Sequence, residues 1–144
     1  MIAIASDHAG VALKTDILLF LRGLGLEVED LGPGDASSVD YPDYAHLLAR
    51  AVSDGRIEWG VLICGTGLGM SMTANRHSGV RAALCHDAYT AEMARRHNDA
   101  NVLCLGARVL GGGVAEQITR IFAETRFEGD RHQRRVAKIE REES

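Results

Sequence analysis

The sequence has no apolar run long enough to cross a membrane as a helix, since such a span takes about 20 residues. Residues 1–4, Met-Ile-Ala-Ile, lead directly into strand-like sequence, so we expect no signal peptide and a cytoplasmic location. A cationic excess is also missing, because the formal net charge is −4. That balance gives no reason to expect nucleic acid or an anionic membrane as a partner. These absences favour a soluble globular protein.

Cysteine is scarce, and its three positions are Cys64, Cys85 and Cys104. An odd number of widely spaced cysteines is typical of free thiols in a reducing compartment, not of a disulfide framework or a zinc knuckle. No group of histidine, cysteine and carboxylate residues has the spacing of a known metal-ligand motif. We therefore expect no metal ion.

The chain of 144 residues is long enough for one domain with a proper core and too short for two ordinary ones. Its apolar share of 46% and charged share of 25% are those of a globular protein. The sequence shows no internal repeat, linker or low-complexity segment. The predicted organisation is a single domain over residues 1–144.

Short apolar stretches alternate along the chain with segments of helical periodicity. The expected strands are residues 2–6, 26–31, 61–63, 81–85 and 102–105. Helices are expected between and after them, with bounds of 9–24, 89–97 and 131–140 for three of them, and Gly111–Gly113 are expected in a loop. Nearly all-apolar strands that alternate with helices predict an α/β protein with a parallel sheet covered on both faces.

The most informative stretch is Trp59–Arg76, in which an apolar strand ends in a cysteine and a run of glycines. Cys64 is followed by Gly65, Gly67 and Gly69 and then by a small-residue helix. Backbone N–H groups exposed by such a loop, together with the positive end of the helix, can bind an anion. A helix N-terminus also favours the thiolate of a nearby cysteine. This stretch predicts an anion cradle beside a reactive thiol.

Other interpretations of the glycine stretch stay open at this point. Gly65–Gly69 begins like a dinucleotide-binding fingerprint, but Met70 stands where the third glycine of that pattern is due. No Gly-Lys-Ser/Thr follows, so the phosphate-binding loop of nucleoside triphosphatases is excluded. The glycines could also form a purely structural tight turn, and Cys64 could be a buried small hydrophobe.

Because parallel strands all end at one edge of a sheet, the residues that follow the strands are expected to converge there. The converging segments are Asp7-His8, the loop that carries Tyr41, Cys64–Gly69, His86-Asp87 and Gly106–Arg108. Asp7-His8 is either an acid–base pair or a helix cap beside a bystander histidine.

Two polar segments are predicted at the opposite edge, because each follows a helix. They are His97–Asp99 and the basic stretch that contains Arg131 and Arg135, four apart on one helix face. A run such as 131–141 is usually only a solvated helix face. If these segments serve the same site as Cys64, they come from a second subunit, which predicts an active site shared across a homodimer.

Six blocks of the sequence together resemble the ribose-5-phosphate isomerase B family, whose wider group includes galactose-6-phosphate and allose-6-phosphate isomerases. The blocks run in order and cover nearly the whole chain: residues 6–10, 40–45, 64–69, 74–76, 96–101 and 129–136. The resemblance implies a Rossmann-like three-layer α/β/α sandwich around a five-stranded parallel sheet, without a cofactor, that works as a dimer or a tetramer of dimers. The basic helix at 131–141 is then expected at the subunit interface.

The resemblance also implies an aldose–ketose isomerisation through a cis-enediol(ate), from D-ribose 5-phosphate to D-ribulose 5-phosphate of the pentose phosphate pathway. Cys64 is then the base that moves a proton between C1 and C2, and His97, helped by Asp7, opens the sugar ring. The developing oxyanion is held by Thr66 and by the amides of Gly65, Gly67, Leu68 and Gly69. Asn98 and Tyr41 position the sugar, and the implied phosphate ligands are His8, Arg108, Arg131 and Arg135.

One position assigns the chain to a branch of that family. Another branch uses a glutamate as the base at the position of Met70, and methionine cannot do that work. The chain therefore fits the cysteine branch. Two alternatives remain: a six-carbon substrate such as allose 6-phosphate or galactose 6-phosphate, and a non-catalytic module that binds a sugar phosphate or a nucleotide.

Overall fold

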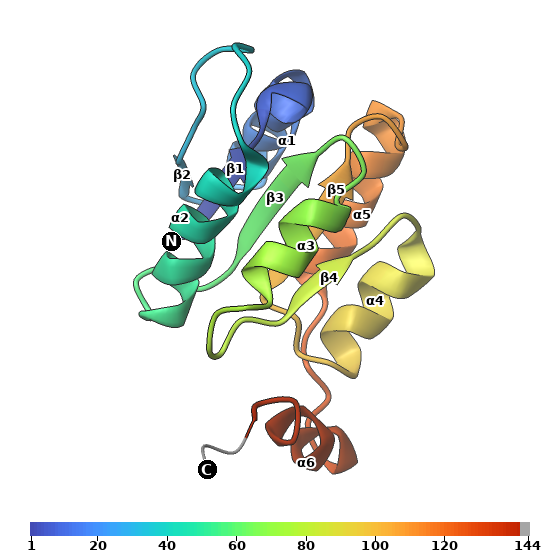
Figure 1. Cartoon of the computed structure of the whole chain (residues 1–144). Helices are drawn as coiled ribbons and strands as arrows, with labels where there is room; N and C mark the ends of the chain where they lie inside the picture. Colours follow the sequence, from blue (N-terminus) through green and yellow to red (C-terminus); the bar gives the residue numbers. More distant parts are fainter. Residues whose placement is uncertain (142–144) are drawn as a thin grey trace.

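The computed structural model describes residues 1–141, which contain one five-stranded sheet in the order β2-β1-β3-β5-β4 (Figure 1). Every neighbouring pair of strands is parallel, as predicted. The strands are β1 (Ile2–Ser6), β2 (Val28–Asp30), β3 (Gly60–Cys64), β4 (Ala82–Leu84) and β5 (Val102–Gly106).

Helices cover both faces of the sheet, so the predicted three-layer α/β/α sandwich is confirmed (Figure 1). One face packs against α1 (Val11–Gly23), α4 (Ala88–Arg96) and α5 (Gly112–Glu124). The other face packs against α2 (Tyr41–Ser53) and α3 (Leu68–Ala74). A last helix, α6 (Arg131–Ala137), lies apart from the sandwich, beyond the amino ends of the strands.

The alternation of side chains in β3 explains why its sequence is apolar throughout. Val61 and Ile63 point into the core beneath α1 and α5, whereas Leu62 and Cys64 point into the core beneath α2 and α3. All five residues of the strand are buried. The same alternation places the Cys64 side chain on the α2/α3 face, at the last position of the strand.

The position of β5 brings two strand ends into direct contact. Because β5 lies between β3 and β4, Cys64 pairs with Gly106 in the register of the sheet. The chain leaves β3 closely over this glycine: a Cβ atom at position 106 would lie 2.7 Å from the carbonyl oxygen of Thr66. A residue with a side chain would push the loop after Cys64 away from the sheet.

Several predicted helix and strand boundaries are wrong, because local hydrogen bonds determine where an element begins and ends. The first predicted helix begins with a 3₁₀ turn (His8–Gly10), because the Asp7 carboxylate accepts the N–H groups of Ala9 and Gly10 and caps it. The edge strand β2 has three residues instead of the six expected, and α6 ends at Ala137 instead of residue 140. Gly111–Gly113 form the N-cap and first turn of α5 instead of a loop.

Two buried side chains anchor α6. Val136 is buried, but Ile139 is 53% exposed, and the second buried side chain of the helix is His132. One of the two anchors of the helix is therefore an imidazole and not an apolar side chain. None of the helices within residues 1–141 has the length and apolar character to span a membrane.

Gly60, where β3 begins, provides a test of the close packing beneath α2. A Cβ atom there would lie 2.7 Å from Cδ2 of Leu48 and 3.1 Å from the carbonyl oxygen of Ala3. We expect Gly60→Ala to lower the free energy of unfolding by about 1–3 kcal/mol, because the core must overpack. Urea denaturation measures the change.

The matched control is Gly113→Ala, in the first turn of α5, where a Cβ atom meets no neighbour within 4 Å. Alanine is the better helix former, so this variant should be as stable as the parent or more stable by up to about 1 kcal/mol. Equal stability of the Gly60→Ala protein and the parent would contradict the packing described here.

Candidate active site

The carboxyl ends of β1, β3 and β5 are tied together by backbone hydrogen bonds. The N–H of Asp7 donates to the carbonyl oxygen of Ile63 (3.0 Å). The N–H of Ala107 donates to the carbonyl oxygen of Cys64 (2.8 Å), and the N–H of Arg108 donates to that of Gly65 (3.0 Å). The structure thus brings together three of the strand ends that the sequence predicts to converge.

The glycine loop closes around the Cys64 sulfur. The N–H of Gly67 donates to Cys64 Sγ at 3.1 Å, and the Cys64 side chain is buried. Gly67 has a φ of 80°, and a Cβ atom there would lie 2.5 Å from Cδ1 of Leu84, so both conformation and space require glycine. The loop thus directs a backbone donor at the sulfur, where it can stabilise negative charge that forms there during a reaction.

Two amides of the expected oxyanion cradle already have partners inside the loop. Besides the Gly67 N–H, the N–H of Leu68 donates to Thr66 Oγ1 at 3.3 Å. A ligand oxygen at this loop must share or replace these contacts. The hydroxyl of Thr66 lies at the same place, so it can exchange its backbone partner for a ligand.

His8 is oriented by the long loop between β2 and α2. The N–H of Val39 donates to Nδ1 of His8 at 3.2 Å. Because Nδ1 is the acceptor, the neutral ring carries its proton on Nε2, which can donate to a ligand oxygen. Asp7 next to it acts as a helix cap, one of the two roles expected for it.

A buried lysine fixes the start of the same loop. Lys14 is 3% exposed, and its ammonium group donates to Asp30 Oδ1 and to the carbonyl oxygen of Pro33, both at 2.7 Å. The charge is therefore paired and hydrogen-bonded, as a buried charge requires. These contacts hold the loop that reaches back to His8.

Tyr41 and Arg108 flank the glycine loop. The Tyr41 ring lies directly against Gly69, since a Cβ atom on that glycine would be 2.5 Å from Cε2 of the tyrosine. The Arg108 guanidinium lies over Gly65, where a Cβ atom would be 3.4 Å from Nη1. The small residues let both larger side chains approach the loop that carries the thiol.

The remaining predicted residues lie at the opposite edge of the sheet, at the lower end in Figure 1. His97 is the C-cap residue of α4, and Asn98 follows it. Arg131 and Arg135 lie on α6, and both are exposed. Within one chain these residues are thus separated from Cys64 by the length of the sheet, as the alternation of strands and helices predicts.

Two residues that sequence reasoning missed adjoin His97. The His132 ring stacks on that of His97, with centroids 4.2 Å apart and an interplanar angle of 12°. Glu128 Oε1 lies 3.5 Å from Nε2 of His97 and 3.6 Å from Nε2 of His132. The spacing of four between Glu128 and His132 was a usable signal, but nothing in the sequence indicates that His97 packs between α4 and α6.

The electrostatics of this cluster have identifiable causes. Burial lowers the pKa of His132, and repulsion from His97 and Arg131 lowers it further, against the attraction of Glu128. The hydrogen bond from Arg96 lowers the pKa of the Glu128 carboxyl group. Near neutral pH the cluster therefore contains a neutral His132 and an ionised Glu128.

The ligand atoms of His97, Glu128 and His132 lie within 4.8 Å of one another, a spacing that a metal ion could bridge. The environment opposes a cation, because the Arg96 guanidinium lies 3.0 Å from the Glu128 carboxylate and already neutralises it. The same three groups are suited to hold a proton. The sequence-based expectation of no metal stays a prediction.

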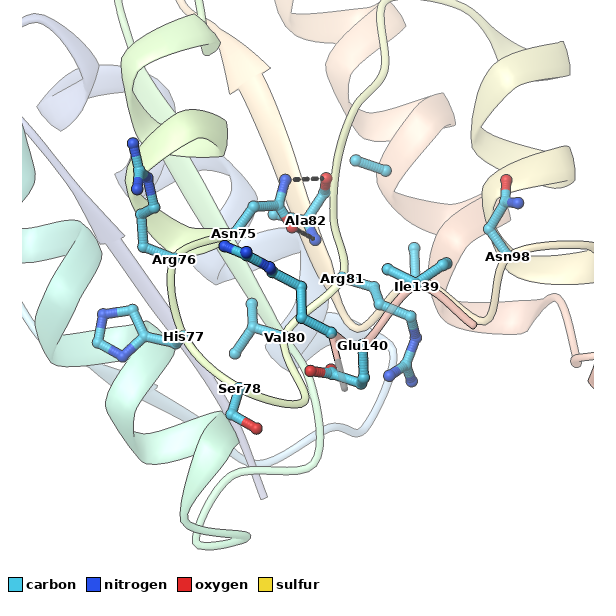
Figure 2. A pocket seen from close by; sticks show the side chains of 13 residues that line it. Asn75, Arg76, His77, Ser78, Val80, Arg81, Ala82, Asn98, Ile139 and Glu140 are labelled. Atoms are coloured by element: carbon cyan, nitrogen blue, oxygen red, sulfur yellow. Dashed lines mark hydrogen bonds between the residues drawn. The ribbon is translucent and has the colours of Figure 1, made fainter. Parts of the chain in front are cut away.

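A groove beside Asn98 opens at this edge, with a cavity volume of about 660 Å³. Figure 2 shows its wall, formed by the segment from Asn75 to Ala82 and by Ile139 and Glu140 after α6. The Glu140 carboxylate accepts the N–H of Gly79 at 2.7 Å and so ties the residues after α6 to the α3–β4 segment. The groove contains Asn98 but none of the residues around Cys64.

The fold and the cluster of strand ends define the class of open-sheet parallel α/β proteins, which bind ligands at the carboxyl ends of their strands. The sequence model of the Ribose/Galactose Isomerase family matches residues 2–139. The chain belongs to this family.

Individual relatives agree with that assignment. Ribose-5-phosphate isomerase B of Escherichia coli is 44% identical over 138 residues, which cover 96% of this chain and 93% of that protein. D-erythrulose-4-phosphate isomerase of Pectobacterium atrosepticum is 44% identical over 140 residues, with 96% and 91% covered. The crystal structure of ribose-5-phosphate isomerase B from Mycoplasma genitalium with bound ribulose-5-phosphate superposes with a TM-score of 0.92 at 46% identity, covering 96% of this chain and 92% of that chain. The resemblance read from the sequence is confirmed.

The three cysteines should differ in reactivity. Burial raises the pKa of Cys85 to about 11, and it raises the pKa of Cys104 as well, so both thiols are neutral at pH 8. Since the thiolate is the nucleophile, we expect iodoacetamide to modify Cys64 first in the folded protein. Peptide mass spectrometry over a time course measures this order.

The control for this experiment is a Cys64→Ser variant, which should take up almost no label while folded and should label at both remaining cysteines in urea. Labelling of Cys85 or Cys104 as fast as Cys64 in the folded parent would contradict the difference between the sites.

Proposed function

We propose that this enzyme converts D-ribose 5-phosphate to D-ribulose 5-phosphate through a cis-enediolate. The observation that carries the proposal is the Cys64 sulfur, which lies at the carboxyl end of β3 and accepts the N–H of Gly67 within a glycine loop. Relatives of 44% identity and more carry isomerase names, and one solved relative holds ribulose-5-phosphate. This membership counts against a non-catalytic binding module.

Cys64 transfers the proton in the proposed reaction. Its thiolate removes the proton from C2 of the open-chain aldose, and the electron pair moves to O1, which becomes the enediolate oxygen. Thr66 and the loop amides stabilise that charge. The thiol then returns the proton to C1 while the proton of O2 moves to O1, so that the ketose forms and the thiolate is regenerated.

A second subunit completes the proposed site. His97, Asn98, Arg131 and Arg135 lie at the far edge of the chain that contributes Cys64. We infer a homodimer, or a tetramer of dimers, in which the basic helix α6 crosses to the partner. There His97 opens the sugar ring with the help of Asp7, and the arginines bind the phosphate with His8 and Arg108.

The number of carbon atoms in the sugar needs a separate test. A six-carbon phosphate needs more room between the thiol and the arginines, whereas the Pectobacterium relative is named for a four-carbon sugar. One chain places the thiol, whereas the proposal takes Arg131 and Arg135 from the partner, so one chain alone does not set the distance between them. Turnover of four-, five- and six-carbon phosphates, measured with a chelator in excess, ranks the substrates and tests the expectation that no metal is needed.

Replacing the base tests the mechanism directly. In Cys64→Ala, kcat for ribose 5-phosphate should fall by about 10²–10⁴-fold or more, because no group remains to move the proton. Substrate should still bind in calorimetry, since the phosphate contacts lie elsewhere. Cys85→Ala is the matched control and should keep its turnover. Near-normal turnover of Cys64→Ala would remove the thiol from the mechanism.

Mixed dimers test the shared site. A dimer of one Cys64→Ala subunit and one His97→Ala subunit contains one site with both residues intact and one with neither. An equal mixture of the two inactive variants should therefore recover up to about a quarter of the parent activity after subunit exchange, from the statistics of random pairing. Absence of any rescue in mixed dimers proven by mass spectrometry would refute the shared site.

A further inference from the structure

Glu128 is held in a fixed position between α4 and α6. Its backbone N–H donates to the carbonyl oxygen of Arg96 at 3.1 Å, and its Oε2 accepts from Nη2 of the same arginine at 3.0 Å. Arg96 is in turn held by Glu92, one turn earlier on α4, at 3.1 Å. A carboxylate tied in this way at backbone and side chain has little freedom to turn away from its neighbours.

The other carboxylate oxygen faces the two stacked imidazoles. Oε1 lies 3.5 Å from Nε2 of His97 and 3.6 Å from Nε2 of His132. His132 is 6% exposed, and its Nε2 has no hydrogen-bond partner among the described residues, whereas the His97 side chain is 38% exposed. Of the two rings, only that of His97 can therefore reach a ligand. The buried His132 ring fixes the plane of the His97 ring.

Burial and the surrounding charges keep one of the two rings neutral. The charged groups around the pair are Glu128, which is bound to Arg96 of α4, and Arg131 and Arg135 of α6. Burial and repulsion from His97 lower the pKa of His132, so that ring stays neutral. The Glu128 carboxylate therefore faces a neutral His132 and the more exposed ring of His97.

We propose that Glu128 is a positioning residue for the ring-opening step, in which it orients His97 and stabilises the imidazolium that forms there. The inference rests on the proposed function, which assigns ring opening to His97. In that step His97 takes the proton of the C1 hydroxyl as the C1–O4 bond breaks and the C1–O1 double bond forms. His97 then gives the proton to O4, so no proton is gained or lost. His132 holds the plane of the His97 ring.

A four-carbon substrate isolates this step. D-erythrulose 4-phosphate and its aldose carry the phosphate on O4, so no hydroxyl is free to close a five-membered ring. Their interconversion needs the enediolate chemistry and the phosphate contacts but no ring opening. A relative of 44% identity is named for this substrate.

The experiment compares Glu128→Gln with the parent on both substrates. Glutamine keeps an acceptor for Arg96 and removes only the charge. We expect kcat for ribose 5-phosphate to fall by about 10–100-fold, as for other groups that orient a reacting side chain. The kcat of the variant for D-erythrulose 4-phosphate should stay within about twofold of the parent value. Glu92→Gln, which removes the other carboxylate bound to Arg96, should change neither value.

Three results would overturn the inference. Equal losses on both substrates would show that Glu128 only holds α6 in place, and unchanged turnover on both would show that its charge has no role. If the four-carbon sugar is not a substrate at all, the kinetics on ribose 5-phosphate decide. The kcat of Glu128→Gln should then fall while its KM stays within about twofold of the parent value. A rise in KM as large as the fall in kcat overturns the inference.

A separate variant tests the function on which the inference rests. If His97→Asn keeps its turnover of ribose 5-phosphate, the ring-opening role of His97 is wrong, whatever Glu128 does. If His97→Asn loses that turnover and Glu128→Gln does not, only the inference about Glu128 fails.

Discussion

The burial of both faces of a parallel sheet is the constraint on which the rest of this structure depends. Each strand of the central three, β1, β3 and β5, is buried over all five residues, so no polar side chain can project from the middle of the sheet without losing its water. Polar groups are confined to the strand ends. The carboxyl ends of these strands are then hydrogen-bonded to one another, which turns three separate loops into one rigid surface around Cys64.

Much of this arrangement could be predicted from the sequence, because it follows from local patterns. Apolar runs that alternate with helical periodicity predict parallel strands, and parallel strands place Cys64, Asp7 and Arg108 at one edge. The order of the strands could not be predicted, since the contact between Cys64 and Gly106 depends on β5 crossing over β4. The ends of elements were only partly predictable: a cap by Asp7 could be expected, but the 3₁₀ turn that its two hydrogen bonds produce could not, because it leaves no periodic signal.

The cluster at the opposite edge shows a second limit. His97, Glu128 and His132 are distant in sequence and meet only because the segment after α5 returns to α4, where the backbone N–H of Glu128 binds the carbonyl oxygen of Arg96. In the proposed function the two edges carry different chemistry. Cys64 at one edge moves a proton between two carbon atoms, and His97 at the other edge moves a proton between two oxygen atoms. Under that proposal, their separation within one chain makes assembly of two subunits a condition of catalysis.

The glycines around Cys64 have a consequence for how such a site can change over time. At positions 67 and 106 a single methyl group would collide with Leu84 and with the backbone of Thr66, so the floor beneath the thiol is built from main chain and tolerates no side-chain variation. Tyr41, which covers Gly69 and is 41% exposed, is under no such restriction. In the proposed function, a change of substrate is therefore easier at the side chains around the loop, such as Tyr41, than within the loop itself. The backbone then keeps the chemistry, and side chains select the sugar.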